Sequence, residues 1–245
     1  MKKRVFFFVP YPRQGPSVRL RVEQFLPYLE AEGIGYKVRS FLTPSFYDIL
    51  YKEGNALRKF LLFLFCFSRR LIDVIHALSY DTIFIHREAF PIGPPVFEAI
   101  LFLCGKSIVF DYDDAIYLPS QGSSRIISFL KCPWKTNFIV RHSKFVIAGN
   151  EYLKEHARNL NPSIKVIPTS IDTDKYKKGE GPVAKENIVI GWIGSHTTQI
   201  FLKELEGVFT MLTSRYKNLA IHLVGSSPDI IKNERIVIKS WSLDT

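Results

Sequence analysis

The sequence contains few cysteines, no long apolar run and no tract of low complexity. Its cysteines, Cys66, Cys104 and Cys132, are scattered and odd in number, which fits neither a disulfide framework nor the spacing of metal ligands. We therefore expect a reducing compartment, the cytoplasm. The first apolar run follows a basic start and stops at Pro10, which is too short for the core of a signal peptide. It is better interpreted as a buried strand.

The composition is that of a globular protein with a surplus of positive charge. The chain has 245 residues, of which 47% are hydrophobic and 23% charged, enough for one large domain or two smaller ones. Its formal net charge of +10 indicates an acidic partner, such as nucleotide phosphates, anionic lipid or nucleic acid. The basic residues are dispersed rather than interleaved with aromatic residues in one tract. Nucleic acid is therefore the weakest of the three, and we expect none.

Short apolar runs alternate with longer amphipathic stretches through the first part of the chain. We predict strands at 4–9, 36–41, 82–86, 107–110, 145–148 and 165–167, separated by helices that include 17–32, 123–142 and 150–160. Ser17 is expected to cap the helix at 17–32, Pro27 to kink it and Gly33 to end it. Strands that alternate with helices are typical of βαβ units, so the expected fold class is α/β, with a parallel sheet covered on both faces.

The alternation restarts after a polar stretch. Residues 171–187 are polar, with glycine and proline, and we interpret them as a linker between an N-terminal Rossmann-like domain, 1–170, and a second domain, 188–245. The second domain should contain strands at 188–192, 219–224 and 236–238 and a helix at 194–216. A Rossmann-like half normally needs more strands to bury both faces of its sheet. We therefore expect this second domain to be incomplete.

Three carboxylates follow the predicted strand at 107–110. Ligands of open parallel sheets bind beyond the carboxyl ends of the strands, which is where Asp111, Asp113 and Asp114 fall. An acid at this place can simply cap the next helix, but three exceed what a cap requires, and we predict that they are catalytic. The strand followed by D-x-D also resembles the first motif of haloacid-dehalogenase-type phosphatases, with Asp111 as nucleophile and Asp113 as general acid. The acid pair that binds magnesium in that family does not follow the late strands, so the phosphatase is an alternative.

Two glycine-bearing loops are candidates for binding phosphate. Gly15 lies in the loop after the first strand, and Arg19 and Arg21 come just inside the next helix, where a guanidinium can clamp a phosphate. Solvated surface arginines are the plainer interpretation. In the second domain, Gly194 and Ser195 turn the chain from a strand into a helix whose first N–H groups suit a phosphate. The turn matches neither a P-loop nor the G-x-G-x-x-G pattern, so an ordinary tight turn is the alternative.

Residues 60–67 are continuously apolar and are flanked by basic residues. The run is too short to span a bilayer, and a buried helix is the favoured interpretation. The flanking Arg58, Lys59, Arg69 and Arg70 also suit a helix lying at an anionic membrane surface. The protein would then be peripheral on the inner face of the cytoplasmic membrane. A non-catalytic membrane-surface or sugar-binding module is a further alternative.

Several segments occur in an order that resembles a known family. They are RVEQFLPYLEAEGI, HREAFPIGPPVFEAI, IVFDYDDAIY, GNEYLKEHARNLNPSIKVIPTSIDTDKYK and IGWIGS. Together they resemble the family 4 (group 1) glycosyltransferases of the GT-B fold, over essentially the whole chain. The most specific part is PTSIDTDKY followed by IGWIGS.

The resemblance implies two Rossmann-like domains that face each other across a cleft. The N-terminal domain would hold the acceptor and the C-terminal domain a nucleotide-diphosphate sugar. A hexosyltransferase of this kind moves the sugar to a hydroxyl of a glycan or lipid-linked acceptor, with retention of configuration, in surface polysaccharide synthesis. Negative charge grows on the leaving diphosphate, so positive dipoles should face it. No metal is implied, and no cofactor besides the donor.

The resemblance also distributes roles among the residues. The Gly15 loop and the turn at Gly194 and Ser195 would flank the diphosphate, and the carboxylates at 111–114 would face the acceptor. The other residues expected to bind substrate are Arg19, Arg21, Arg87, Glu88, His196 and Gly225. The E-x7-E element that contacts the donor in this family is missing. We therefore expect a truncated chain that binds the donor weakly and turns over little.

Overall fold

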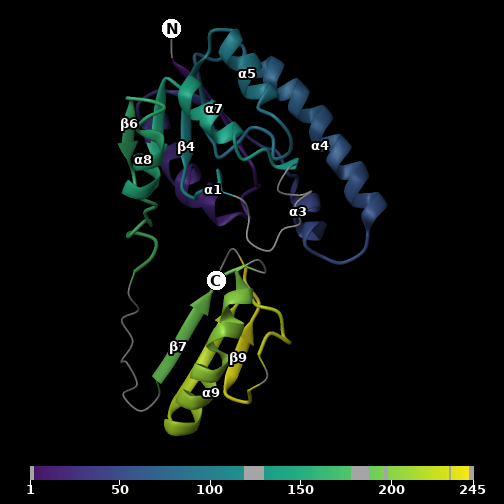
Figure 1. Cartoon of the computed structure of the whole chain (residues 1–245), viewed down its shortest axis with the longest axis vertical. Helices are drawn as coiled ribbons and strands as arrows, with labels where there is room; N and C mark the ends of the chain where they lie inside the picture. Colours follow the sequence, from purple (N-terminus) through teal and green to yellow (C-terminus); the bar gives the residue numbers. More distant parts are fainter. Residues whose placement is uncertain (1–2, 119–129, 178–187, 196–197, 232, 243–245) are drawn as a thin grey trace. The chain divides into compact units, whose positions relative to one another are not determined.

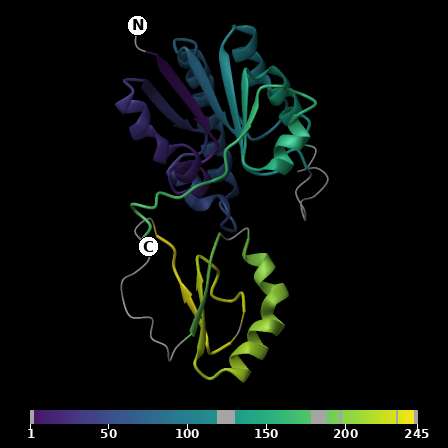
Figure 2. The same ribbon diagram turned by 90° about the vertical axis from the view of Figure 1, so that its left-hand side faces the viewer.

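The computed structural model describes residues 3–118, 130–177, 188–195, 198–231 and 233–242. The chain divides into two units, Met1–Tyr176 and Lys177–Thr245. Each unit is built on its own parallel sheet (Figures 1 and 2). The chain is therefore α/β in both units, as the alternation of strand and helix patterns predicts.

A six-stranded sheet forms the centre of the first unit, with the spatial order β2-β1-β3-β4-β5-β6. The strands are β1 (Arg4–Val9), β2 (Gly35–Ser40), β3 (Thr82–His86), β4 (Ser107–Tyr112), β5 (Phe145–Ala148) and β6 (Ile164–Val166). Every neighbouring pair is parallel. Strands β1, β3 and β5 begin and end at the predicted residues, because their apolar runs are bounded by charged or turn-forming residues.

The helices of the first unit lie on both faces of this sheet (Figure 2). They are α1 (Pro16–Arg21), the 3₁₀ helix η1 (Glu23–Phe25), α2 (Leu26–Ala31), α3 (Pro44–Leu50), α4 (Ala56–Ala77), α5 (Val96–Leu103), α7 (Lys135–His142) and α8 (Glu151–Ala157). Of the predicted helix at 123–142, α7 is the end, and residues 123–129 lie outside the described part of the chain. Helix α8 follows Asn150, whose side chain accepts a hydrogen bond from Leu153 N at 2.9 Å.

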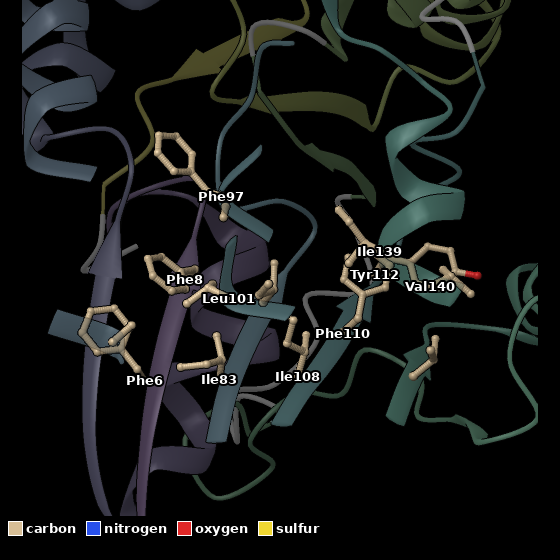
Figure 3. Packing of buried hydrophobic residues seen from close by; sticks show 14 of the residues in the cluster. Phe6, Phe8, Ile83, Phe97, Leu101, Ile108, Phe110, Tyr112, Ile139 and Val140 are labelled. Atoms are coloured by element: carbon tan, nitrogen blue, oxygen red, sulfur yellow. The ribbon is translucent and has the colours of Figure 1, made fainter. Parts of the chain in front are cut away.

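The alternation of side chains along the strands divides the core between the two faces of the sheet. Phe6 and Phe8 of β1 lie on the same side as Ile83 of β3, next to side chains of α5 and α7 (Figure 3). Phe7 points to the opposite side and packs with Val18 of α1. Each such side chain contributes about 1.5–3 kcal/mol when fully buried. The sheet is consequently fixed from both sides, and the ends of its strands are held in place.

The predicted helix at 17–32 is broken rather than merely kinked. Gly15, and not Ser17, is the residue before the helix, and Pro16 begins it. The break falls at Val22, whose φ is −128°, and Pro27 lies in the first turn of α2, where its missing N–H costs nothing. Gly33 adopts φ +68°, which confirms it as the end of the helical stretch.

The bounds of β2, β6, β7 and β9 differ from the predicted ones by one residue, and two other predicted elements differ by more. Strand β4 continues two residues past the predicted end, so Asp111 lies within the strand and not after it. The predicted helix at 194–216 is a 3₁₀ helix, η2 (Gln199–Leu205), followed by α9 (Glu206–Arg215). The short turns of η2 place Leu202 in the core of the second unit.

The apolar run at 60–67 belongs to α4, which is not the buried helix that was favoured from the sequence. Cys66 is buried, but Phe60, Leu61 and Phe65 are each 57% exposed. The helix runs along the outside of the first unit (Figure 1). The buried residues of α4 are Cys66 of this run together with Arg70, Asp73, Val74 and Ala77.

The second unit contains a three-stranded parallel sheet. Its strands, β7 (Ile188–Ile193), β8 (Leu219–Val224) and β9 (Ile236–Lys239), lie in that order. Phe209 of α9 packs with Ile221 and Leu223 of β8 to form the core. Strand β8 has the predicted bounds, and its alternating burial shows that one face of the sheet is covered better than the other.

Candidate functional site

A cavity of about 760 Å³ opens at the carboxyl ends of the first unit's strands. In the strand order 2-1-3-4, the chain runs from β1 to β2 toward one edge of the sheet and from β3 to β4 toward the other. Such a reversal creates a crevice at the carboxyl ends of the strands, where open α/β sheets bind ligands. The cavity is lined by residues that follow β1, β2, β3 and β4, among them Pro10, Tyr11, Phe41, Leu42, Arg87, Glu88 and Asp114, together with Phe46 of α3, Phe63 of α4 and Lys135 of α7. Its size and mainly apolar lining are those of a small-molecule site.

The charged side chains of the cavity are arranged in pairs. Arg87 Nη2 contacts Asp114 Oδ2 at 2.8 Å, and Lys135 Nζ contacts Glu88 Oε2 at 2.6 Å. Lys135 Nζ also donates to Phe90 O at 2.7 Å, although its side chain is almost completely buried. The structure thus brings together the three predicted residues Arg87, Glu88 and Asp114. Lys135 was missed, because nothing in its sequence neighbourhood marks it as a functional residue.

Arg87 has a backbone conformation that is unusual for a residue with a side chain. Its φ is +66°, and its N–H donates to Asp111 O at 2.7 Å. Left-handed conformations of this kind cost about 1–3 kcal/mol and cluster at functional sites. Burial alone lowers the pKa of the guanidinium, but the neighbouring Tyr11, Asp113 and Asp114 outweigh burial, and the pKa of Arg87 is raised above its usual value. Arg87 therefore offers a permanent positive charge to the cavity.

Asp111 does not line the cavity and lies in a buried cluster with Arg21 and His86. Its two carboxylate oxygens are bonded to the Arg21 guanidinium, with Arg21 Nε at 3.3 Å from Oδ2, and His86 Nδ1 lies 2.7 Å from the same Oδ2. His86 and Asp111 are paired in register on neighbouring strands, so their side chains point to the same face, which α1 covers. Arg21 Nη1 also donates to Ile167 O at 2.5 Å.

This cluster gives Asp111 and Arg21 a different place from the one predicted. Both side chains are at least 94% buried, and each is engaged by groups of the protein itself. Because they are bonded to one another, Asp111 is not presented to a sugar and Arg21 is not presented to a phosphate. Their effect on the cavity is indirect, since the Asp111 carbonyl holds the turn at Arg87.

Asp113 is packed against Gly149, the residue that follows β5. A Cβ atom at Gly149 would lie 2.9 Å from Asp113 Cα, so glycine is required for this approach. Asp113 Oδ1 is buried, and no hydrogen-bond partner for it occurs among the described residues. Asp113 is absent from the lining of the cavity, in contrast to its exposed neighbour Asp114. The three predicted carboxylates thus occupy three distinct environments.

Gly15 and Arg19 shape the loop that follows β1. Gly15 N donates to Pro12 O at 2.8 Å, and a Cβ atom at Gly15 would lie 2.6 Å from Tyr11 Cβ. Arg19 Nη1 donates to the carbonyls of Arg13 and Gln14 at 2.9 and 3.1 Å. Both residues therefore fix the path of the loop, and through it the position of Tyr11 at the wall of the cavity.

The predicted glycines of the second unit lie together at the carboxyl ends of β7 and β8. Gly194 N donates to Val224 O at 3.1 Å, and a Cβ atom at Gly225 would collide with Gly194 O. Ser195 N donates to Thr198 Oγ1 at 3.0 Å and so begins the turn into η2. His196 was predicted to bind substrate and lies outside the described residues. The close approach of the two backbones is a feature that phosphate-binding turns share.

We expect Gly225→Ala to destabilise the second unit by about 1–3 kcal/mol, because Gly225 has φ +83° and its neighbour on the crowded side is backbone. Gly207→Ala is the matched control. Gly207 lies in α9 with open space around it, so alanine there should stabilise the unit by about 0.5–1 kcal/mol. Chemical unfolding followed by hydrogen exchange of the β8 amides measures both effects. Equal effects of the two substitutions would contradict the crowding.

The described residues offer no clear metal site. Among them, no group of three or more His, Cys, Asp or Glu side chains is placed to hold a metal ion. The cavity instead presents three cations, Arg87, Lys131 and Lys135, and two carboxylates, Glu88 and Asp114. Such a set can bind an anionic group and orient a hydroxyl at the same time.

The chain has the GT-B fold. No protein-family model matches its sequence, and no curated protein does. Among solved structures, it is similar to a putative UDP-N-acetylglucosamine 2-epimerase from Listeria monocytogenes, with a TM-score of 0.60, 12% identity and coverage of 99% of this chain and 70% of the other. It is also similar to the S. aureus MnaA–UDP co-structure, with a TM-score of 0.58, 14% identity and coverage of 98% and 68%.

A third similar structure is described as trehalose-6-phosphate from E. coli bound with UDP-2-fluoro glucose. The TM-score is 0.58 and the identity 11%, with coverage of 99% of this chain and 74% of the other. These neighbours have the GT-B fold, which confirms the predicted fold class of two parallel-sheet α/β units. At 11–14% identity, the likeness concerns the fold.

Proposed function

We propose that the protein is a glycosyltransferase that uses a nucleotide-diphosphate sugar. The observation that carries this proposal is the cavity at the switch point between β1 and β3, in a chain of the GT-B fold. Two of the similar structures are described as bound to UDP or a UDP sugar, which supports a nucleotide sugar as donor. The acceptor, a hydroxyl of a glycan or a lipid-linked sugar, would enter the cavity of the first unit.

The second unit would contribute the donor site. Gly194 and Gly225 bring the ends of β7 and β8 close together, and the turn through Ser195 leads into η2. The N–H groups of Gly194 and Ser195 are bonded to Val224 O and Thr198 Oγ1, so these two residues would shape the site. The positive end of the following helical stretch would favour the diphosphate, on which negative charge grows as the glycosidic bond breaks. Retention of configuration and a role in surface polysaccharide synthesis, both implied by the family resemblance, belong to the same proposal.

In the first unit, Arg87 and Glu88 are the residues that we assign to the acceptor. Arg87 provides a fixed positive charge, and Glu88 is oriented by Lys135 at 2.6 Å. A carboxylate held in this way can accept a hydrogen bond from the acceptor hydroxyl and fix its direction of attack. Asp114 neutralises part of the Arg87 charge and lines the same wall.

The phosphatase alternative loses its support in the structure. A nucleophilic aspartate needs a carboxylate oxygen that can reach phosphorus. Both oxygens of Asp111 are instead bonded to Arg21 and His86, in a buried cluster. The glycosyltransferase proposal requires no such attack by Asp111, and it uses the residues that do line the cavity.

The proposal is tested by nucleoside diphosphate release from a panel of UDP-, ADP-, GDP- and dTDP-sugars, with and without alkyl glycoside and lipid-linked acceptors. We expect release that depends on acceptor, and Glu88→Gln should slow it by roughly 10- to 100-fold, since a hydrogen bond to a charged group is worth about 1.5–3 kcal/mol. Glu151→Gln, on the exposed side of α8, is the control and should leave the rate unchanged.

Calorimetric titration with each nucleotide separates binding from turnover. If a nucleoside diphosphate binds but no sugar is transferred, the result supports the proposed donor site and shows that the tested acceptors are not substrates. Absence of nucleotide binding together with absence of release would refute the proposal.

A further inference from the structure

Helix α4 exposes large apolar side chains on one side and buries two charged ones, among apolar residues, on the other. Its 22 residues include a buried charged pair, Arg70 and Asp73, which faces the sheet. Arg70 Nη2 donates to Val9 O at 3.3 Å, and its guanidinium lies 4.8 Å from the centre of the Phe8 ring. Arg39 Nε contacts Asp73 Oδ1 at 2.6 Å. The polar groups that normally face water are therefore used to attach the helix to the sheet.

The outward side of α4 consists of large apolar residues. The exposed ones are Leu57, Phe60, Leu61, Leu64, Phe65, Leu71, Ile72 and Ile75. They recur every three or four residues, with Ser68 between them, so they form one continuous face along the helix. At 1.5 Å per residue this face is about 30 Å long. An apolar surface of this kind, which we call the α4 face, marks an interaction site.

The charges around the α4 face are of one sign. The structure describes all of α4, and its only acidic residue is the buried Asp73. Arg58 is exposed on one flank of the face, about 100° from its centre line, and Arg69 on the same flank donates to Ser40 O and Phe41 O at 2.6 and 2.8 Å. The whole chain carries a formal net charge of +10. A second copy of the chain would bring equal positive charge to the face, whereas the phosphates of an anionic lipid surface complement Arg58 and the net charge of the chain.

No helix of the described residues is long and apolar enough to cross a membrane. An apolar face flanked by basic residues is instead the pattern of a helix that lies in the plane of the interface. Long basic side chains at its edge reach the head groups while the apolar side chains enter the acyl region. Helix α4 runs along the outside of the first unit (Figure 1), and the side chains of the α4 face are exposed.

We propose that the α4 face docks the protein on an anionic lipid bilayer. The inference rests on exposure, spacing and charge, and it holds whether or not the chain transfers sugar. If it does, Phe63 gives the docking a consequence, because this α4 residue lines the cavity of the first unit. A membrane-bound acceptor then has a short path from the bilayer to the residues Arg87 and Glu88.

The test is flotation of the full chain with vesicles of phosphatidylcholine, with or without phosphatidylglycerol. We expect binding that requires phosphatidylglycerol and weakens between about 0.1 M and about 0.5 M salt as the charges are screened. Leu61→Glu with Ile72→Glu should reduce binding by about tenfold or more. The control pair, Ile200→Glu with Met211→Glu, changes equally exposed apolar residues of the second unit and should bind like the unmodified chain.

A milder pair, Leu61→Ala with Ile72→Ala, keeps the test valid if the glutamate variant does not fold, which circular dichroism will reveal. It should lose part of the binding without a change in charge. No binding of the unmodified chain to anionic vesicles, or equal binding to neutral ones, overturns the proposal. A dimer that the glutamate pair converts to monomers overturns it as well, because the occupant of the α4 face would then be a second copy.

Discussion

Replacing Asp111 by asparagine will cost the first unit about 3–5 kcal/mol of folding free energy, although the two side chains have nearly the same shape. Asp111 is 1% exposed and Arg21 6% exposed, so the guanidinium has little access to water. The substitution leaves that cation buried without its counter-charge and turns an N–H₂ group toward either Arg21 or His86. Since a domain is stable by only about 5–15 kcal/mol, the loss is a large fraction of the total.

Asp114→Asn in the same acidic segment provides the contrast. Its partner is Arg87, and the Asp114 side chain is 64% exposed, so its loss should cost less than about 1 kcal/mol. Chemical unfolding measures both variants. Because the chain has two units, hydrogen exchange of the amides in β3 and β4 is needed to assign the change to the first one.

The double variant Arg21→Met with Asp111→Leu completes the cycle. Exchange of a buried ion pair for apolar residues of similar volume is often neutral, so we expect it to recover most of the loss caused by Asp111→Asn. Recovery would show that the single variant fails through an unpaired buried charge. A cost of Asp111→Asn below about 1 kcal/mol would mean that Arg21 finds other partners, and the buried cluster would not be the structural link described above.

The strands were predictable because their signal is local. β1, β3, β5 and β8 are short apolar runs bounded by polar or turn-forming residues, and each has the predicted bounds. The end of β4 was wrong for a physical reason. Asp111 looks like a residue that closes a strand, but on the sheet it is neutralised by Arg21, which is distant in sequence. Tertiary pairing of this kind leaves no trace in the local pattern.

The candidate site was predictable in position more than in detail. The rule that ligands bind at the carboxyl ends of parallel strands led to Arg87, Glu88 and Asp114, which line one cavity. It could not separate Asp114 from Asp111, because the sequence does not show that β4 continues through Asp111, which is buried, and ends before Asp114, which is exposed. Lys135, Phe46 and Phe63 were missed, since they reach the cavity from helices whose sequences look like ordinary core.

The orientation of α4 could not be predicted from the sequence either. A continuous run such as 60–67 gives no period by which to choose the buried side of a helix. The choice is made by Arg70 and Asp73, which bond to β1 and to Arg39 and so turn Leu61, Phe65 and Ile72 outward. Charged residues buried within an apolar helix were the signal that the sequence offered for this orientation.

Replacing Arg87 by glycine will abolish most of the proposed activity while leaving the fold as stable as before. The rate of sugar transfer should fall by roughly 10²-fold, because Arg87 is assigned to position the acceptor and a small misplacement of the reacting groups costs about this much. The unfolding free energy should stay within about 1 kcal/mol of its original value, because glycine relieves the strain of φ +66° and offsets the lost contact with Asp114.

Asn55→Gly is the matched control for the relief of backbone strain at a positive φ. Asn55 also has a positive φ, +56°, precedes α4 and is not part of the cavity lining. Its replacement should alter stability by a few tenths of a kcal/mol and leave the transfer rate unchanged. If Arg87→Gly instead destabilises the first unit by several kcal/mol, Arg87 serves the fold, and Glu88 must carry the acceptor without it. If stability and rate are both retained, Arg87 does not contact the acceptor. The acceptor then binds outside this cavity, and the assignment of the cavity is wrong.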